Sequence, residues 1–293
     1  ALRHARARQS EARGASKRIR GRAEVKRVLW TISVAAGVYL VLVGALYLGQ
    51  RALLYHPDTS PLEPERAGLP ESALVETQTD DYLDLKHFFV PPGDPEAPVV
   101  VVFHGNAGNA GDRVAKFTRL IAGGYGLFLA EYRGYGGNPG TPSEAGLIAD
   151  GESVLDWLEE RGFGEARLVL YGESLGSGVA MALAERQRVR AIVLEAPFTS
   201  IGAAAQEHYP YVPAKWLVKD RFDNLGRAPG IDLPILILHG EKDRVMPSRH
   251  GEAVAEAAPR ASLRLFPEAG HTALFEHGAL DQVLDFLGQV YAR

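Results

Sequence analysis

The sequence predicts an α/β protein with a mostly parallel, doubly wound sheet and flanking helices, preceded by one N-terminal transmembrane helix. Short β-branched apolar runs recur along the chain, and stretches of roughly 10 to 18 residues with helical spacing separate them. An uncharged apolar segment precedes them all. The composition is globular, with 46% hydrophobic and 23% charged residues. The chain has no Cys, which excludes a disulfide framework, a thiol nucleophile and a Cys-based metal site.

A basic tail, residues 1–27, comes first. It carries ten Lys and Arg against two Asp and Glu, a net charge of +8, and it lacks an apolar periodicity that could build a core. Because the whole chain has a net charge of −4, residues 28–293 carry −12. Phosphate binding needs clustered Lys and Arg, so this acidic main body predicts no nucleic-acid partner. We expect the tail to be solvated and cytoplasmic.

The apolar segment, Val28–Leu48, predicts a membrane anchor. It contains 21 residues without a charge, and about 20 apolar residues suffice to cross a ~30 Å hydrocarbon core. Trp30 and Tyr47 lie near its ends, where interfacial aromatic residues belong. Since positively charged flanks stay in the cytoplasm, the basic tail predicts a cytoplasmic N-terminus. The domain after residue 48 is then extracytoplasmic, in a periplasm, a lumen or the exterior.

Two other interpretations of this segment remain. A buried core helix is disfavoured by the length of the uncharged run. A cleaved signal peptide is the stronger alternative, but its apolar region is typically about 7–15 residues long after a short basic lead. Here both the apolar run and the lead are longer, which favours an uncleaved single-pass anchor.

The elements of the α/β domain follow in order. Residues 49–72 are rich in Pro and Glu and predict a surface linker, and residues 73–293 predict the domain itself. The predicted strands are Ala73–Gln78, Leu83–Val90, Pro98–Phe103, Leu127–Glu131, Arg167–Tyr171, Ala191–Glu195, Ile235–His239 and Leu263–Phe266. The predicted helices are Arg113–Ala122, Glu144–Arg161 with Ser143 as its N-cap, Leu175–Arg186, Ser248–Ala258 and Leu280–Tyr291. The first two strands flank Asp80 and Asp81, a weak hairpin signal.

Ser174 is the candidate nucleophile. It lies in the string GESLG, residues 172–176, between the strand Arg167–Tyr171 and a helix that begins with small residues. This G-x-S-x-G pattern in a strand–turn–helix context is typical of a nucleophile elbow, where glycines permit a sharp turn that exposes the Ser hydroxyl. An isolated match would mean little, since the alternative is a Gly-rich turn without chemistry.

A Ser nucleophile needs a base and a carboxylate that orients it. His271 follows the last strand in a loop, and a neutral His can accept the Ser proton. Asp243 lies in the loop after Ile235–His239, and the chain order Ser, Asp, His is that of an elbow-type hydrolase. Glu195 at the end of its strand is the alternative acid, although no short loop lets it reach across. The other histidines considered, His208, His250 and His277, lack this context and are expected to be solvated.

An oxyanion hole is predicted from two backbone N–H groups. The strand Pro98–Phe103 ends in the Gly-rich string HGNAGN, residues 104–109. We assign the N–H groups of Asn106 and of Leu175, the residue after the nucleophile, as donors to a tetrahedral oxyanion. His104 and His239 each precede a Gly at a strand end and are expected to be structural.

The sequence predicts no cofactor and no metal. It contains no G-x-G-x-x-G, G-K-[ST] or H-E-x-x-H pattern. The string GYGGNP, residues 134–139, comes nearest to a dinucleotide-binding loop, but Pro139 stands where the third Gly is required.

These motifs resemble the α/β-hydrolase superfamily. They are most similar to its small membrane-anchored branch of serine esterases, lipases and thioesterases, which shares motifs with serine aminopeptidases. The matching strings are FHGNAGN (103–109), EYRGYGGNPGTPSEAGLIAD (131–150), YGESLGSG (171–178), EAPFTS (195–200), HGEKDRVMP (239–247) and EAGH (268–271). The resemblance implies Ser174 as nucleophile, His271 as base and Asp243 as its partner. Glu131 departs from the Asp usual in that branch, with little catalytic consequence expected.

The predicted function is hydrolysis of acyl esters or thioesters through a Ser-His-Asp triad. Residues 198–232 predict a short cap whose four large aromatics either line an acyl pocket or pack the cap onto the body. A serine aminopeptidase-like activity is the alternative, and it would need a carboxylate that holds the substrate amine. A non-catalytic binding protein with this fold is a third possibility, although such proteins normally lose a triad residue. The expected partners are a small-molecule or lipid acyl substrate and the membrane, and the sequence does not indicate whether there is a protein partner. The aromatics are Tyr209, Tyr211, Trp216 and Phe222, and the candidate carboxylates are Glu207, Asp220 and Asp223.

Overall fold

The computed structural model describes residues 2–186 and 188–292, with side chains from Lys26 onward. The chain divides into two compact units, which meet between Gln50 and Arg51. The described part of the first unit is helical and belongs to α1 (Leu2–Leu54). The last four residues of α1, Arg51–Leu54, belong to the second unit. Within α1, Lys26–Leu54 is long and apolar enough to cross a membrane, and its most apolar stretch is exposed. A core helix would bury that stretch, whereas an anchor or a signal sequence would not.

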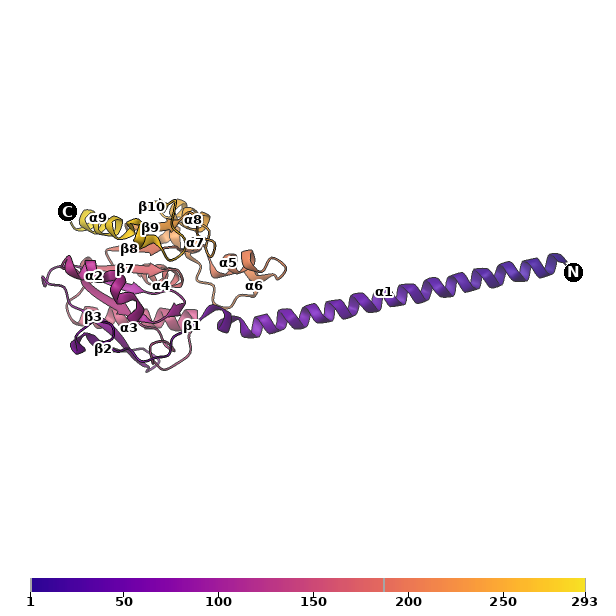
Figure 1. Ribbon diagram of the computed structural model, residues 1–293, viewed down its shortest axis with the longest axis horizontal. Coiled ribbons are helices and arrows are strands. Elements are labelled where there is room, and N and C mark those ends of the chain that lie inside the picture. Colours follow the sequence, from indigo (N-terminus) through magenta and orange to yellow (C-terminus); the bar gives the residue numbers. More distant parts are fainter. Residues whose placement is uncertain (1, 187, 293) are drawn as a thin grey trace. The chain divides into compact units, whose positions relative to one another are not determined.

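The second unit is built on an eight-stranded sheet (Figure 1). The strand order is β10-β9-β8-β7-β4-β6-β3-β2, and all neighbours pair in parallel except β3, which is antiparallel to both β2 and β6. The prediction of a mostly parallel sheet is therefore confirmed. The strands are β2 (Leu74–Gln78), β3 (Asp84–Val90), β4 (Val99–Phe103), β6 (Gly126–Ala130), β7 (Leu168–Glu173), β8 (Ala191–Glu195), β9 (Ile235–Gly240) and β10 (Ala261–Phe266).

Helices cover both faces of the sheet, as a doubly wound fold requires. Alternate residues of β4 enter the two hydrophobic cores: Val99 and Val101 lie in one, and Val100 and Val102 lie in the other. All the side chains of β4 are buried, because a hydrophobic core covers each face of the strand. This explains its continuous apolar sequence. The first core is closed by α3 (Glu144–Glu160), α4 (Leu175–Ala184) and α8 (Arg249–Ala257), and the second by α2 (Val114–Ala122) and α9 (Ala279–Tyr291).

The remaining elements are short. The cap between β8 and β9 contains three helices and one 3₁₀ turn. Residues 49–72, expected as a surface linker, continue α1 to Leu54, add the strand β1, and bury Tyr55 and Leu62. The short elements are α5 (Ile201–His208), α6 (Ala214–Leu217), α7 (Asn224–Arg227), β1 (His56–Pro57), β5 (Ala107–Gly108), η1 (Glu71–Ala73), η2 (Ala110–Arg113), η3 (Glu165–Arg167), η4 (Ala228–Gly230) and η5 (Leu274–His277).

Candidate active site

Ser174 is the single residue between β7 and α4, and its backbone conformation is strained. Its φ is 49° and its ψ is −110°, a region that residues with a side chain rarely occupy. The flanking glycines are required by contact. A Cβ on Gly172 would lie 2.6 Å from the Cα of Ser177, and a Cβ on Gly176 would overlap the carbonyl of Phe103. The sharp turn predicted from the sequence is therefore present.

The structure brings Ser174, His271 and Asp243 together, although 97 residues separate the first two. The hydroxyl Oγ of Ser174 lies 3.1 Å from Nε2 of His271, and Nδ1 of His271 lies 2.6 Å from Oδ2 of Asp243. This relay has the geometry of a nucleophile, a base and an orienting carboxylate. The His271 side chain is 18% exposed, whereas that of Asp243 is fully buried.

The Asp243 carboxylate is stabilised in its charged form. Burial alone would raise its pKa, but hydrogen bonds from His239, His271 and the N–H of Met246 outweigh burial and hold the pKa well below its usual range. Its second oxygen, Oδ1, accepts the backbone N–H groups of Val245 and Met246 at 2.8 and 2.7 Å. Oδ2 therefore remains available to His271. His239, expected as structural, is fully buried behind this carboxylate.

The two predicted oxyanion donors lie on the turns that meet at Ser174. Gly105 faces the elbow, because a Cβ there would lie 3.7 Å from the Cβ of Ser174. Within the described chain, the N–H groups of Asn106 and Leu175 donate no hydrogen bond to protein atoms. For Leu175 the reason is its position at the first residue of α4, where no intrahelical acceptor exists. Both donors are thus available to a ligand.

A buried pair supports the turn that carries Asn106. Nε2 of His104 lies 2.8 Å from Oε1 of Glu131, and both side chains are almost completely buried. Oε2 of Glu131 accepts the N–H of Ala110 at 2.7 Å, and Nδ1 of His87 accepts the N–H of Glu131 at 2.9 Å. Burial lowers the pKa of His87 to about 3, so this ring stays neutral and can accept. The Glu131 that departs from the usual Asp therefore fills a structural position.

Glu195 lies in a different cluster from His271. Its Oε2 is 2.6 Å from Nζ of Lys116 and also accepts the hydroxyl of Tyr171. Lys116, on α2, contacts Glu173 as well, at 3.2 Å. Burial would lower the pKa of Lys116, but the two carboxylates outweigh it and raise the pKa above its usual value. The sequence does not reveal this cation, because nothing in the amphipathic pattern of α2 marks Lys116 as half-buried.

The burial of His250 and of the cap aromatics differs from what the sequence predicts. His250 was expected to be solvated but is 3% exposed, because its Nδ1 lies 2.9 Å from the hydroxyl of Thr199 at the start of the cap. The cap aromatics differ in their burial. Phe222 is fully buried against Gly178 of α4, whereas Tyr211 and Trp216 are 68% and 74% exposed.

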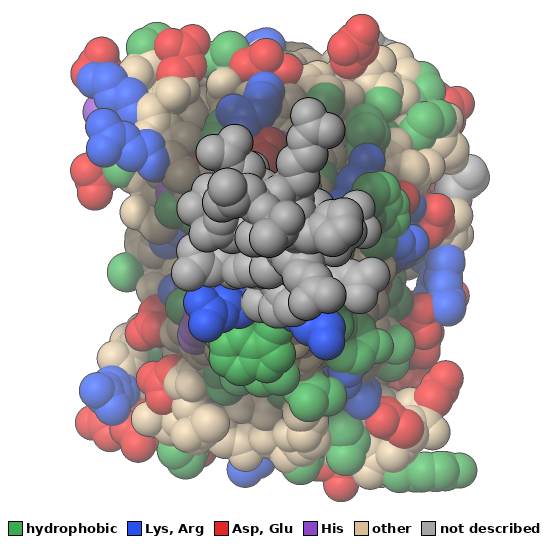
Figure 2. Space-filling model, turned by 90° about the vertical axis from the view of Figure 1, so that its right-hand side faces the viewer, with side chains coloured by type: hydrophobic (Ala, Val, Ile, Leu, Met, Phe, Trp, Pro, Cys, Tyr) green, Lys and Arg blue, Asp and Glu red, His purple; other side chains and the backbone are tan. Residues whose placement is uncertain are grey.

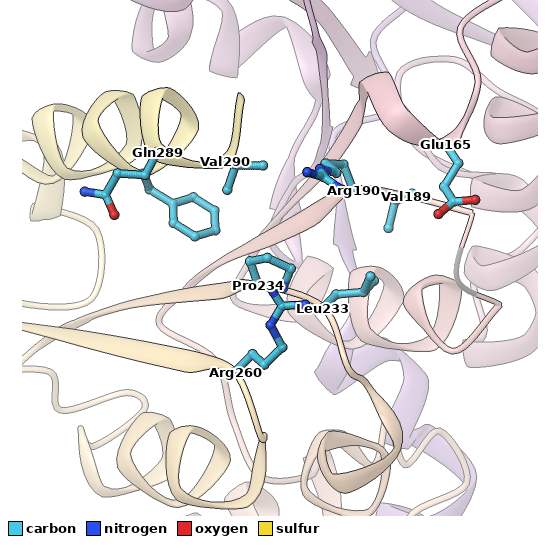
Figure 3. Close-up of a pocket in the computed structure, with 9 residues that line it drawn as sticks. Glu165, Val189, Arg190, Leu233, Pro234, Arg260, Gln289 and Val290 are labelled. Atoms are coloured by element: carbon cyan, nitrogen blue, oxygen red, sulfur yellow. The ribbon is translucent and has the colours of Figure 1, made fainter. Parts of the chain in front are cut away.

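A cavity lies away from Ser174 (Figure 3). Its volume is about 230 Å³, and it is lined by residues of α9 and by residues that precede β7, β8, β9 and β10, among them Glu165, Arg190, Leu233 and Arg260. The residues that precede the strands lie at the end of the sheet opposite to the nucleophile. Figure 2 shows one face of the molecule, on which Lys and Arg side chains are interspersed with Asp and Glu. Among the described residues, no group of three or more His, Asp or Glu side chains could hold a metal ion.

The fold and the Ser-His-Asp arrangement place this protein among the α/β-hydrolases. Residues 94–225 and 223–278 match the family described as “Serine aminopeptidase, S33”, and the chain belongs to this family of α/β-hydrolases. The esterase Pf2001 of Pyrococcus furiosus has the same fold, with a TM-score of 0.62 at 19% identity over 80% of this chain and 98% of that one.

Several relatives are similar in sequence. Uncharacterized protein Rv2307c of Mycobacterium tuberculosis is 34% identical over 248 residues, which are 84% of this chain and 88% of that protein. Protein bem46 of Schizosaccharomyces pombe is 33% identical over 72% of this chain and 75% of that protein. Lysophosphatidylserine lipase ABHD12 of Xenopus tropicalis is 35% identical over 65% of this chain, which spans 58% of the lipase. One of these sequence relatives is thus named as a lipase.

Proposed function

We propose that this protein is a serine hydrolase that cleaves acyl esters or thioesters through an acyl-enzyme intermediate. The observation that carries the proposal is the hydrogen-bonded relay from Ser174 Oγ through His271 to Asp243, at 3.1 and 2.6 Å. A relay of this kind has no evident structural purpose at a half-buried turn, whereas it is what Ser-based acyl transfer needs.

The reaction follows from the positions of these groups. Ser174 Oγ attacks the carbonyl carbon of the substrate while Nε2 of His271 takes the hydroxyl proton. The carbonyl oxygen becomes an oxyanion, which the N–H groups of Asn106 and Leu175 stabilise. The intermediate collapses to acyl-Ser174, and the alcohol or thiol leaves with the proton from His271. A water molecule, activated by the same His271, then releases the acid and restores the hydroxyl of Ser174.

Contacts of the cap disfavour the aminopeptidase alternative. A peptidase of that kind needs a free carboxylate for the substrate amine, and each candidate has another partner. Asp220 accepts two hydrogen bonds from Arg51, Asp223 caps α7 through the N–H of Gly226, and Glu207 pairs with Arg249. The lipase relative further favours a lipid acyl substrate over a peptide.

A substrate screen tests the reaction class. We expect the full-length chain, purified in detergent, to hydrolyse acyl esters or thioesters of graded chain length with a higher kcat/KM than any aminoacyl arylamide. The Ser174→Ala variant serves as the blank for contaminating hydrolases. A higher kcat/KM for an arylamide would establish the aminopeptidase alternative instead.

We further propose that the apolar part of α1 is an uncleaved anchor with the hydrolase unit outside the cytoplasm. The proposal is supported by the +8 charge of residues 1–27 and by the exposed apolar span Lys26–Leu54. Protease added outside spheroplasts should digest the hydrolase unit, and the intact chain should resist carbonate extraction. Full protection from protease, or extraction of the intact chain by carbonate, would contradict this topology.

A further inference from the structure

The segment that follows the apolar span makes direct contact with a predicted oxyanion residue. We call residues 51–57 the juxtamembrane segment. Nδ2 of Asn106 donates to the carbonyl of Leu54 at 2.9 Å, and the N–H of His56 donates to the carbonyl of Asn106 at 2.9 Å. Leu54 is the last residue of α1, six positions after the end of the uncharged run Val28–Leu48. Asn106 is therefore held on both its side chain and its backbone by this segment.

The contact continues along the chain on both sides. His56 and Pro57 form β1, which pairs in parallel with Ala107 and Gly108 of β5, directly after Asn106. Tyr55, between these contacts, is 4% exposed and belongs to the hydrophobic core. The Gly-rich turn after β4 is thus paired with β1. The pairing restricts a segment that its glycines would otherwise leave conformationally free.

The other end of the juxtamembrane segment is tied to the cap. The guanidinium of Arg51 donates two hydrogen bonds to Asp220, at 2.8 and 3.0 Å. Paired N–H groups on one carboxylate fix orientation as well as distance. Asp220 is 6% exposed at its side chain and also accepts the N–H of Glu144, the first residue of α3. The segment is consequently fixed at Arg51 and at His56.

We propose that the juxtamembrane segment is a positioning element of the oxyanion hole. An oxyanion donor stabilises the transition state only if it is held in place before the charge develops. The segment supplies that restraint, because it holds the side chain and the carbonyl of Asn106 while the Asn106 N–H stays available. The inference rests on the proposed function, since an oxyanion forms only if Ser174 attacks a carbonyl.

The test separates transition-state binding from substrate binding in the full-length chain. Asn106→Ala removes the hydrogen bond to Leu54 and keeps the backbone N–H. Two inhibitors with the acyl chain of the best ester are compared: a trifluoromethyl ketone, whose hemiketal oxyanion occupies the hole, and an ether, which has no carbonyl. We expect kcat and ketone affinity to fall about tenfold, as loss of one hydrogen bond predicts, with KM and ether affinity nearly unchanged.

The matched control is Asn138→Ala. Asn138 is buried, and its side chain bonds the backbone of Lys86 rather than the juxtamembrane segment. We expect this variant to unfold at a lower temperature while the ratio of the two affinities stays at the wild-type value. A structural defect alone would therefore not mimic the expected result.

Arg51→Met provides a second variant on the exposed end of the segment, in case Asn106→Ala fails to fold. We expect it to lower kcat and ketone affinity a few-fold, again with the ether affinity retained. Equal losses for the two inhibitors, or no loss for either, would overturn the inference. Failure of the wild-type chain itself to hydrolyse esters or bind the ketone would instead refute the proposed function.

Discussion

Replacing Ser174 with alanine should lower kcat by about 10⁶-fold and abolish labelling by a fluorophosphonate probe. Loss of the nucleophile removes the covalent route entirely, and in a well-studied serine protease it costs a factor of that order. The fold should persist, because alanine adds no new clash at a turn that already holds φ at 49°. Labelling can be read on a gel, and the fold by thermal unfolding.

Ser177→Ala is the matched control for that change. Ser177 lies one helical turn away, and its hydroxyl donates to the carbonyl of Ser174 at 2.6 Å. The substitution removes a buried hydroxyl and one hydrogen bond to the Ser174 backbone but leaves the Ser174 side chain unchanged, so the probe should still label the variant. Undiminished labelling of Ser174→Ala would refute the assignment of Ser174 as nucleophile.

Asp243→Asn should lower kcat by about 10⁴-fold, as neutralising the corresponding carboxylate does in a serine protease with this triad. An amide that donates toward Nδ1 of His271 would select the tautomer that leaves Nε2 protonated and unable to accept from Ser174. The charge that stabilises the imidazolium is lost as well. The depressed pKa of Asp243 means that this carboxylate is ionised throughout the neutral range in the wild type. Steady-state kinetics on an acyl ester measures the effect.

Glu195→Gln is the comparison that makes this result specific. Glu195 was the alternative acid in the sequence, and its side chain is bonded to Lys116 and Tyr171. We expect its neutralisation to leave kcat within a few-fold and to lower the unfolding temperature, because a buried ion pair loses one partner. A large kcat loss in Glu195→Gln with little loss in Asp243→Asn would transfer the orienting role to Glu195.

The sequence predicts those parts of the fold that depend on local hydrophobic pattern and on the position of residues after parallel strands. Buried strands such as Val99–Phe103 have a continuous apolar sequence that marks them directly. Ser174, Asp243 and His271 each follow a strand, so the parallel sheet brings them to one edge. Their proximity could therefore be predicted, although their catalytic roles remain predictions.

Long-range contacts were the part that the sequence could not supply. His56 lies in a Pro-rich stretch that looks like a linker, and only the docking of β1 on β5 shows its contact with Asn106. His250 looks like a surface residue because its partner, Thr199, is 51 positions away. The half-buried Lys116 is missed for the same reason, since its two carboxylates come from different strands. Side-chain pairing across the fold leaves no periodic trace.

The hydrogen bond between Leu54 and Asn106 bears on where the enzyme meets its substrate. With Val28–Leu48 in a bilayer, as proposed above, only residues 49–53 of the chain separate the span from Leu54, whose carbonyl accepts the hydrogen bond from Asn106. A lipid ester would then encounter Ser174 by lateral diffusion within a two-dimensional film, without being extracted into bulk water. The quantity that governs catalysis would be the mole fraction of substrate in that film, so inert lipid added to the bilayer would slow the enzyme by dilution.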